Sequence, residues 1–387
     1  MKIAKSVNRL GTEAVYNIFA KTKKLTKEGK DIIDLSLGQS DFKSPAHAVN
    51  AAIKALKEGH HGYTLPNGII ECRESVSRKI KTLYKAEVGP ERIIIMPGGK
   101  PTMHYAISFF GEVGSEIVFP DPGFPIYESM INFTGAKPVP YNMTENEDFS
   151  INPSKILSLI NSKTSLLILN NPHNPTGGFT ERKKIDELVK GLKNFPNLAI
   201  LSDEVYDRLI FGEKEIPTLL NYPELYDRLI VLNGWSKTYA MTGWRLGWGV
   251  WPEELIEHVF KFCVNSHSCV NTPAQHGAIA ALDGPEDHLK NMMEEFDARR
   301  KLMIDGLRSL KGIECSLPGG SFFAFPNVKK TGMNGEQFTE KCLKDAGVAM
   351  IPGTAFGKFA TDNVRINFAT SRQNISKAIE KISKILK

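Results

Sequence analysis

The stretch RIIIMPGGKPTMHYAISFFGEV, residues 92–113, holds an apolar run, a glycine turn and a helical pattern in direct succession. The run at 92–96 is apolar at consecutive positions, which is typical of a strand covered on both faces of its sheet. The following residues, 101–113, have the length and composition of a helix. A strand followed by a helix is the repeating unit of mostly parallel α/β sheets.

The same alternation continues through the middle of the chain. Further strand candidates lie at 116–119, 137–141, 165–170, 198–202, 229–233 and 246–250. Helical patterns fit between most of them, for example at 181–195. We therefore predict an α/β fold, with a mostly parallel sheet covered by helices.

The pattern changes after about residue 285. A long helix is predicted at 286–310, a region with fewer strands follows, and a last helix is predicted at 373–386. Residues 1–45 also lie outside the alternating block. We predict two domains: a large one at 46–285, and a smaller α+β domain built from both chain ends, 1–45 plus 286–387.

The composition is typical of a soluble globular protein. The chain has 387 residues, 41% of them hydrophobic, and its net charge of +6 is spread along the sequence. The densest basic run, KTKKLTKEGK at 21–30, is interpreted as a solvated helix face rather than a nucleic-acid site. No window approaches 18 uncharged apolar residues, so no membrane span is expected.

The cysteines and histidines indicate the cellular compartment and whether a metal site is expected. The five cysteines show no CxxC spacing, which favours a reducing compartment, and the first 20 residues lack the continuous apolar stretch of a signal peptide. We expect a cytoplasmic protein. The histidines do not have the spacing of ligands on one helical face, so no metal site is expected.

Two glycine-containing motifs follow the first strands, where ligands of open α/β sheets bind. In PGGKPT (97–102) the glycines allow close backbone approach, and the helix N-terminus suits a phosphate, although a structural turn is about as plausible. The motif is not a P-loop, because Pro101 stands where Ser or Thr is needed. In DPGFP (121–125), Phe124 could stack on a planar ligand, although a lone phenylalanine is more often core.

Polar motifs end the next two strands. NNPHNPTGG (170–178) forms a tight turn whose asparagines offer directional amide groups. SDEVY (202–206) ends a buried strand with Asp203 and Glu204, which is costly unless they are paired. These carboxylates either cap the next segment or face a cationic ligand atom.

Three basic residues complete the set of candidate site residues. Lys237 follows the strand at 229–233, in NGWSKTY, where Trp235 and Tyr239 could partly desolvate it. Desolvation makes a neutral, nucleophilic amine available. Arg245 lies between glycines in TGWRLG (242–247), and Arg365 lies in the apolar run VRINFAT (364–370), where a buried arginine needs an anion.

Pyridoxal 5′-phosphate (PLP) carries the phosphate, planar ring, ring nitrogen and aldehyde that these motifs require. Together, SKTYAMTGWRLG (236–247), NNPHNPTGG and SDEVY resemble the class I, fold-type I PLP-dependent aminotransferases, and most of all the prokaryotic-type aspartate aminotransferase branch. The resemblance runs from LSLGQSDF (35–42) to VRINFAT.

For the catalytic centre, the resemblance implies that Lys237 binds the cofactor covalently and moves the proton between the substrate Cα and the cofactor C4′. It implies that Asp203 pairs with the ring nitrogen and that Phe124 stacks on the ring. It further implies that Tyr206 and Asn174 hydrogen-bond the phenolic oxygen.

For the phosphate, the resemblance implies backbone N–H groups of Gly99 and Lys100, with Ser236 nearby and Arg245 as the counter-charge. Tyr63, in GYTLPNG, would reach the phosphate of the neighbouring subunit, which implies a homodimer with shared sites. One departure is Gly234, where many relatives carry a phosphate-binding serine.

For the substrate, the resemblance implies that Arg365 binds the α-carboxylate, helped by Gly38 and with Asn174 beside it. Lys100 is the candidate for binding the distal carboxylate of a dicarboxylic substrate. The alternatives are that its charge only attracts the cofactor phosphate, or that it points to solvent. The expected reaction is ping-pong transamination from aspartate, or from aromatic or varied amino acids, to a 2-oxo acid such as 2-oxoglutarate.

Two other functions are weighed. A carbon–sulfur lyase or an aminocyclopropane-carboxylate-synthase-like enzyme would share the lysine, aspartate and arginine. A ligand-binding regulator that has lost catalysis would usually be fused to a DNA-binding segment, and the aminotransferase pattern leaves no helix-turn-helix for one.

Overall fold

The computed structural model describes residues 1–12, 14–212, 215–216 and 218–386. Within these residues the largest sheet has seven strands, in the order β2-β8-β7-β6-β5-β3-β4. They are β2 (Ile93–Met96), β3 (Glu116–Asp121), β4 (Lys137–Asn142), β5 (Thr164–Asn170), β6 (Ala199–Asp203), β7 (Leu229–Gly234) and β8 (Gly247–Val250). Pairings are parallel from β4 to β7, and β8 runs antiparallel to both β7 and β2. The predicted mostly parallel sheet is confirmed.

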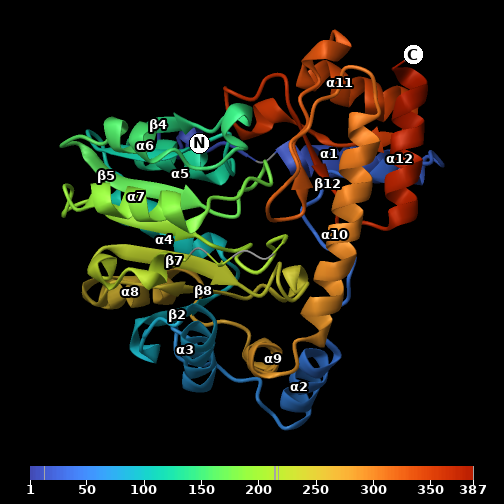
Figure 1. The fold of residues 1–387 in the computed structure, drawn as a ribbon. Coiled ribbons are helices and arrows are strands. Elements are labelled where there is room, and N and C mark those ends of the chain that lie inside the picture. Colours follow the sequence, from blue (N-terminus) through green and yellow to red (C-terminus); the bar gives the residue numbers. More distant parts are fainter. Residues whose placement is uncertain (13, 213–214, 217, 387) are drawn as a thin grey trace.

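The sheet is buried on both faces, as its apolar runs predict. In β2, Ile93 and Ile95 belong to one core cluster, whereas Ile94 and Met96 belong to another. This division follows from the pleat, which sends successive side chains to opposite faces. The surrounding helices (Figure 1) are α2 (Ala46–Lys57), α3 (Ile70–Tyr84), α4 (Lys100–Phe110), α5 (Ile126–Thr134), α6 (Pro153–Leu159), α7 (Arg182–Leu192), α8 (Ile256–Ser266) and α9 (Thr272–Asp283).

Helix α4 shows why a predicted boundary shifts. The sequence pattern extends it to residue 113, but the helix ends at Phe110 because Gly111 adopts an extended conformation. At its other end Gly99 is the N-cap residue and has no side chain to cap the helix. The first turn of α4 therefore points unblocked backbone N–H groups toward the carboxyl edge of the sheet.

A third core cluster draws on both ends of the chain. Its helices are α10 (Asp287–Arg308), α11 (Gly335–Lys341) and α12 (Arg372–Ile385), and its strands are β1 (Ile33–Asp34), β9 (Phe323–Ala324), β10 (Val348–Ala349) and β12 (Val364–Asn367). Strand β11 (Ile351–Pro352) borders it, with Ile351 in the first cluster. Strand β1 pairs in parallel with β10, and β12 lies between β11 and β9. Figure 1 shows α10 and α12 side by side, away from the large sheet.

The N-terminal segment contacts both parts of the molecule. Helix α1 (Ala14–Lys27) leads into β1, but before it the Nε of Arg9 donates to Asn132 O at 2.6 Å, on α5. The Gly11 N–H donates to Ser129 Oγ at 2.9 Å, on the same helix. The segment at 9–11 therefore lies beside α5, at Ser129 and Asn132 in its middle and C-terminal part. The division into domains at 46–285 stays a prediction.

Short helical turns connect these elements. They are η1 (Val7–Arg9), η2 (Pro90–Arg92), η3 (Glu145–Glu147), η4 (Leu219–Asn221), η5 (Pro223–Leu225), η6 (Thr242–Trp244), η7 (Glu253–Leu255), η8 (Lys329–Thr331), η9 (Cys342–Ala346) and η10 (Gly353–Phe356).

Candidate active site

The predicted site residues gather at the carboxyl edge of the large sheet. Asp203 is the last residue of β6, Asn174 lies four residues beyond β5, and Lys237 lies three residues beyond β7. Gly99 lies between β2 and α4. Because these strands are parallel, their carboxyl ends meet at one edge, as the sequence predicts.

Lys237 is half-buried, and its amine points toward the N-terminal segment. Its Nζ donates to Gly38 O at 2.6 Å. The same Nζ lies 5.7 Å from the ring centre of Tyr206 and 5.6 Å from that of Phe322. Rings near this amine therefore include Tyr206 and Phe322, whereas the sequence pattern had indicated Trp235 and Tyr239. Trp235 instead packs in the core and donates its indole N–H to Ala278 O at 3.0 Å.

Asp203 is a buried carboxylate with two donors. Its Oδ2 accepts from the Tyr127 hydroxyl at 2.6 Å, and its Oδ1 accepts from the Val205 N–H at 3.3 Å. Burial raises the pKa of Asp203 to about 6, against the opposing effects of Tyr127, the Val205 amide and the charge of Lys237. A cation placed beside this carboxylate would offset the burial.

Glu204 faces the other way, although it is adjacent in sequence. Its Oε1 accepts from Ser202 Oγ at 2.7 Å and from the Leu219 N–H at 3.0 Å, at the start of η4. Burial raises the pKa of Glu204 to about 7. The sequence left two hypotheses for the carboxylates of SDEVY. Glu204 caps the next segment, whereas Asp203 faces the site at the strand ends.

Asn174 joins the strand ends to Arg365. Its backbone N–H donates to Asn170 Oδ1 at 2.9 Å, and Asn170 Nδ2 donates to the Asp203 carbonyl at 2.9 Å. The guanidinium of Arg365, on β12, donates from Nη1 to Asn174 Oδ1 at 3.1 Å and from Nη2 to Ser36 O at 2.6 Å.

Arg365 is only 3% exposed and stacks between two rings. Its guanidinium carbon lies 4.4 Å from the ring centre of Phe323 and 4.7 Å from that of Phe356. A flat cation held by two aromatic rings and two fixed acceptors has little freedom to turn. Such an arrangement suits a forked contact with a carboxylate.

The glycine turn at 97–99 is shaped by its neighbours. Gly98 has φ +90°, and a side chain there would collide with the guanidinium of Arg245. A Cβ at Gly99 would lie 2.9 Å from Leu232 Cδ2 on β7. Arg245 is itself fixed by donation from Nη1 to Thr242 O at 2.9 Å. The turn thus places the N-terminus of α4 beside the guanidinium of the exposed Arg245, and both groups attract an anion.

The departure at Gly234 has a structural cause. Gly234 ends β7 opposite Gly247 of β8, and a Cβ at Gly234 would lie 2.8 Å from Gly247 Cα and 3.0 Å from Leu246 O. A serine cannot enter there without separating the two strands. Ser236, half-buried in the turn that follows, remains the predicted hydroxyl for the phosphate.

Two predicted residues lie toward the rim. The ammonium of Lys100, the first residue of α4, lies 5.4 Å from the ring centre of Phe124 and 5.8 Å from that of Tyr16. Tyr63 is 94% exposed on the chain, so the structure of one subunit does not bring it to the other site residues.

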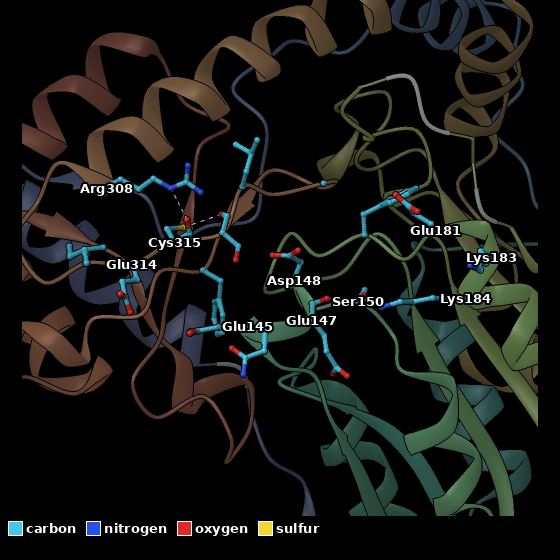
Figure 2. A pocket seen from close by; sticks show the side chains of 17 residues that line it. Glu145, Glu147, Asp148, Ser150, Glu181, Lys183, Lys184, Arg308, Glu314 and Cys315 are labelled. Atoms are coloured by element: carbon cyan, nitrogen blue, oxygen red, sulfur yellow. Dashed lines mark hydrogen bonds between the residues drawn. The ribbon is translucent and has the colours of Figure 1, made fainter.

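A cavity of about 1040 Å³ lies elsewhere, and none of the predicted residues lines it. Figure 2 shows Glu145, Glu147 and Asp148 on one side of it and Glu314, Cys315 and Arg308 on the other. Its walls carry both acidic and basic groups. We place the functional site by its chemistry, at the strand ends, rather than by cavity size.

Sequence reasoning missed Tyr127, Phe322 and the carbonyl of Ser36. Tyr127 had a usable signal, because it follows Phe124 by three residues, one helical turn, and so shares its face. Phe322 and Ser36 lie far from Lys237 and Arg365 along the chain, and no local pattern marks them.

The donor set can be compared with what pyridoxal phosphate requires. The glycine turn with Arg245 matches a phosphate, the buried carboxylate of Asp203 matches a protonated ring nitrogen, and the amine of Lys237 matches an aldehyde. At positions 98 and 99 a Cβ would collide with Arg245 and Leu232, so the close approach of these side chains to the turn requires glycine. The residues fit this cofactor.

Comparisons with known proteins agree with this chemistry. Residues 30–382 match the family model described as "Aminotransferase class I and II". An aspartate aminotransferase of Bacillus subtilis is 32% identical over 100% of this chain and 99% of its own. A (5-formylfuran-3-yl)methyl phosphate transaminase of Methanocaldococcus jannaschii is 36% identical over 96% of each chain. The crystal structure of an aspartate aminotransferase from Rhizobium meliloti superposes with a TM-score of 0.95 at 28% identity, covering 100% of this chain and 99% of that one.

Neither a membrane-spanning helix nor a metal-binding cluster occurs in the described part of the chain. No helix there is long and apolar enough to cross a membrane. No group of three or more His, Cys, Asp or Glu side chains among these residues is placed to hold a metal ion.

Proposed function

The chain belongs to the class I and II aminotransferase family, and we propose that it moves the amino group of L-aspartate to 2-oxoglutarate in a ping-pong reaction. The family match and the full-length transaminase relatives make the protein a PLP-dependent aminotransferase. Aspartate is supported by the names of the Bacillus and Rhizobium relatives. The Methanocaldococcus relative has a different substrate in its name, so the donor needs its own evidence.

The observation that carries the assignment of an amino acid as substrate is the buried guanidinium of Arg365. Its two amino groups are held by Asn174 and Ser36, and the carbonyl of Gly38, two residues after Ser36, accepts from Lys237. An α-carboxylate bound to Arg365 would bring the neighbouring Cα toward that amine. Every amino acid carries this carboxylate, so Arg365 selects the class of substrate and not its side chain.

The other residues receive roles from their chemistry. When bound, PLP supplies an electron-accepting ring that stabilises negative charge at the substrate Cα. Lys237 would hold the cofactor and, once released, take a proton from Cα and return one at C4′. Asp203 would keep the ring nitrogen protonated, and Phe124 would limit movement of the ring.

Remaining contacts orient the polar atoms. Tyr206 and Asn174 would hydrogen-bond the phenolic oxygen of the cofactor. Gly99, Lys100, Ser236 and Arg245 would hold the phosphate, the first two through backbone N–H groups.

We further propose a homodimer in which Tyr63 completes the partner's phosphate site. Tyr63 is exposed, and four apolar side chains within ten residues of it in sequence are exposed as well: Ile53, Leu56, Leu65 and Ile70. Exposed apolar side chains of this number support a surface covered by another protein. Light scattering should give twice the chain mass, and active monomers at assay concentration would contradict this proposal.

The five cysteines are unpaired, which supports our proposal that the enzyme works in the reducing cytoplasm.

The function is tested by half-reactions without an acceptor. Holoenzyme is mixed with one amino acid at a time, and conversion of the cofactor to its amine form is followed by absorbance. L-aspartate should convert the cofactor at the highest kcat/KM, and 2-oxoglutarate should restore the starting spectrum. A faster aromatic donor would replace aspartate as the substrate, and release of ammonia and an oxo acid without the amine form would indicate a lyase.

A further inference from the structure

Tyr127 contacts both Asp203, which is predicted to pair with the cofactor ring nitrogen, and Phe124, which is predicted to stack on the ring face. It lies in the first turn of α5 and is fully buried. Its hydroxyl donates to Asp203 Oδ2 at 2.6 Å. Its ring packs against Phe124 in a T-shaped arrangement, with ring centres 5.8 Å apart and planes at 83°.

The bond to Asp203 is the shorter of the two that hold this carboxylate. The second donor, the Val205 N–H, lies 3.3 Å from Oδ1. Burial and the nearby Asp203 charge raise the pKa of Tyr127 well above its usual value. The hydroxyl therefore keeps its proton, and donates it, throughout the working pH range.

The contact with Phe124 is also fixed by the backbone. The Tyr127 N–H donates to the Phe124 carbonyl at 3.0 Å, across the turn that opens α5. Phe124 and Asp203 come from different strand ends, after β3 and at the end of β6. Tyr127 is thus a direct side-chain link between these two ends.

We propose that Tyr127 is a positioning residue, which keeps the Asp203 carboxylate ionised and aimed at the cofactor ring nitrogen while it sets the angle of the Phe124 ring. This inference rests on the PLP-dependent activity but not on the identity of the amino donor. Loss of the hydroxyl leaves Asp203 with one long hydrogen bond in a buried place. The pKa of Asp203 then rises, so that on acidification the carboxylate becomes protonated at a higher pH than in the wild type. Below that pH the cofactor ring nitrogen has no charged partner, and cofactor binding should weaken.

The test compares Tyr127→Phe with Tyr141→Phe in apo-enzyme titrated with PLP between pH 5 and pH 9. Tyr141 is a matched control, because it is also buried and donates to a backbone carbonyl, Ile168 O, at 3.1 Å. A hydrogen bond to a charged group contributes enough to change an equilibrium roughly tenfold or more. We expect Tyr127→Phe to weaken PLP binding about tenfold at pH 6. Its binding curve should also weaken on the acid side at about one pH unit higher than that of the wild type.

The outcomes that decide the proposal do not depend on the amino donor. On an Asp203→Asn background, where no carboxylate remains to be held, Tyr127→Phe should change the PLP dissociation constant by less than about twofold. A loss that is undiminished on that background would overturn the proposal. So would an unshifted pH profile, an equal shift in Tyr141→Phe, or unfolding of Tyr127→Phe while Tyr141→Phe stays folded by circular dichroism.

Discussion

Replacement of Lys100 by methionine tests how the enzyme chooses its amino donor. Methionine keeps most of the apolar stem and removes the ammonium, which lies 5.4 Å from the Phe124 ring centre and 5.8 Å from the Tyr16 ring centre. The backbone N–H of residue 100 is unchanged, so its predicted phosphate contact should survive. If the ammonium binds the distal carboxylate of aspartate, only dicarboxylic substrates should suffer.

The magnitude follows from one charge-assisted hydrogen bond. Such bonds contribute about 1.5–3 kcal/mol, and a loss of about 1.4 kcal/mol in transition-state binding lowers kcat/KM tenfold. Lys100 is half-buried, so water screens part of the charge and the lower end of this range applies. We expect kcat/KM for L-aspartate to fall roughly ten- to thirtyfold and that for L-phenylalanine to change less than about threefold.

The assay is the half-reaction with each amino acid alone, at saturating PLP, by stopped-flow absorbance. Omitting 2-oxoglutarate matters, because this acceptor is itself a dicarboxylate and would hide the comparison. An equal loss for both donors would mean that Lys100 acts through the cofactor, and no loss for either would mean that the distal carboxylate is bound elsewhere. Either result refutes the role of Lys100 in choosing the donor.

Three further predictions concern the lysine, the strand pair and a buried acid. Lys237→Ala should abolish transamination and the absorption band of the covalently bound cofactor, with an unchanged circular dichroism spectrum; turnover near the wild-type rate would contradict the assignment. Gly234→Ser should lower the free energy of unfolding by about 1–3 kcal/mol, because its Cβ would lie 2.8 Å from Gly247 Cα. A thermal melting point equal to that of the wild type would show instead that the two strands can separate to admit the side chain. The pKa of Glu204 is raised to about 7 in the folded state, so its contribution to stability is present below pH 4.5 and lost as pH rises through 7. Glu204→Gln should therefore improve stability relative to wild type by about 1–3 kcal/mol more at pH 8 than at pH 5, as measured by urea unfolding, and a pH-independent difference would argue against a buried acid.

Much of the large sheet could be predicted because its signal is local. Each apolar run needs only four to six residues to identify a strand, and all seven predicted strands are present within two residues of their predicted bounds. The strand ends then placed Asp203, Asn174 and Lys237 at one edge without further information. The roles assigned to them remain predictions.

What could not be predicted depends on side-chain packing between distant segments. The residue pattern alone left Asp203 and Glu204 equivalent, and only the family resemblance favoured Asp203. In the structure the pleat turns Asp203 toward Tyr127 and Glu204 toward Leu219. Phe322 approaches Lys237 only because the strands of the chain's second half fold back over the sheet edge.

Because β1 pairs with β10, this small sheet cannot form until most of the chain has been synthesised. Ile33 lies opposite Val348. The carbonyl of Ser36 accepts a hydrogen bond from Arg365, which is synthesised 329 residues later. At roughly 5–20 residues per second, this interval lasts about 15–65 s. Throughout it the nascent chain carries an unpaired apolar segment around Ile33 and Leu35, which makes this segment a natural client for chaperones during synthesis. Arg365, the residue predicted to bind the substrate carboxylate, is thus among the last of the predicted site residues to leave the ribosomal tunnel.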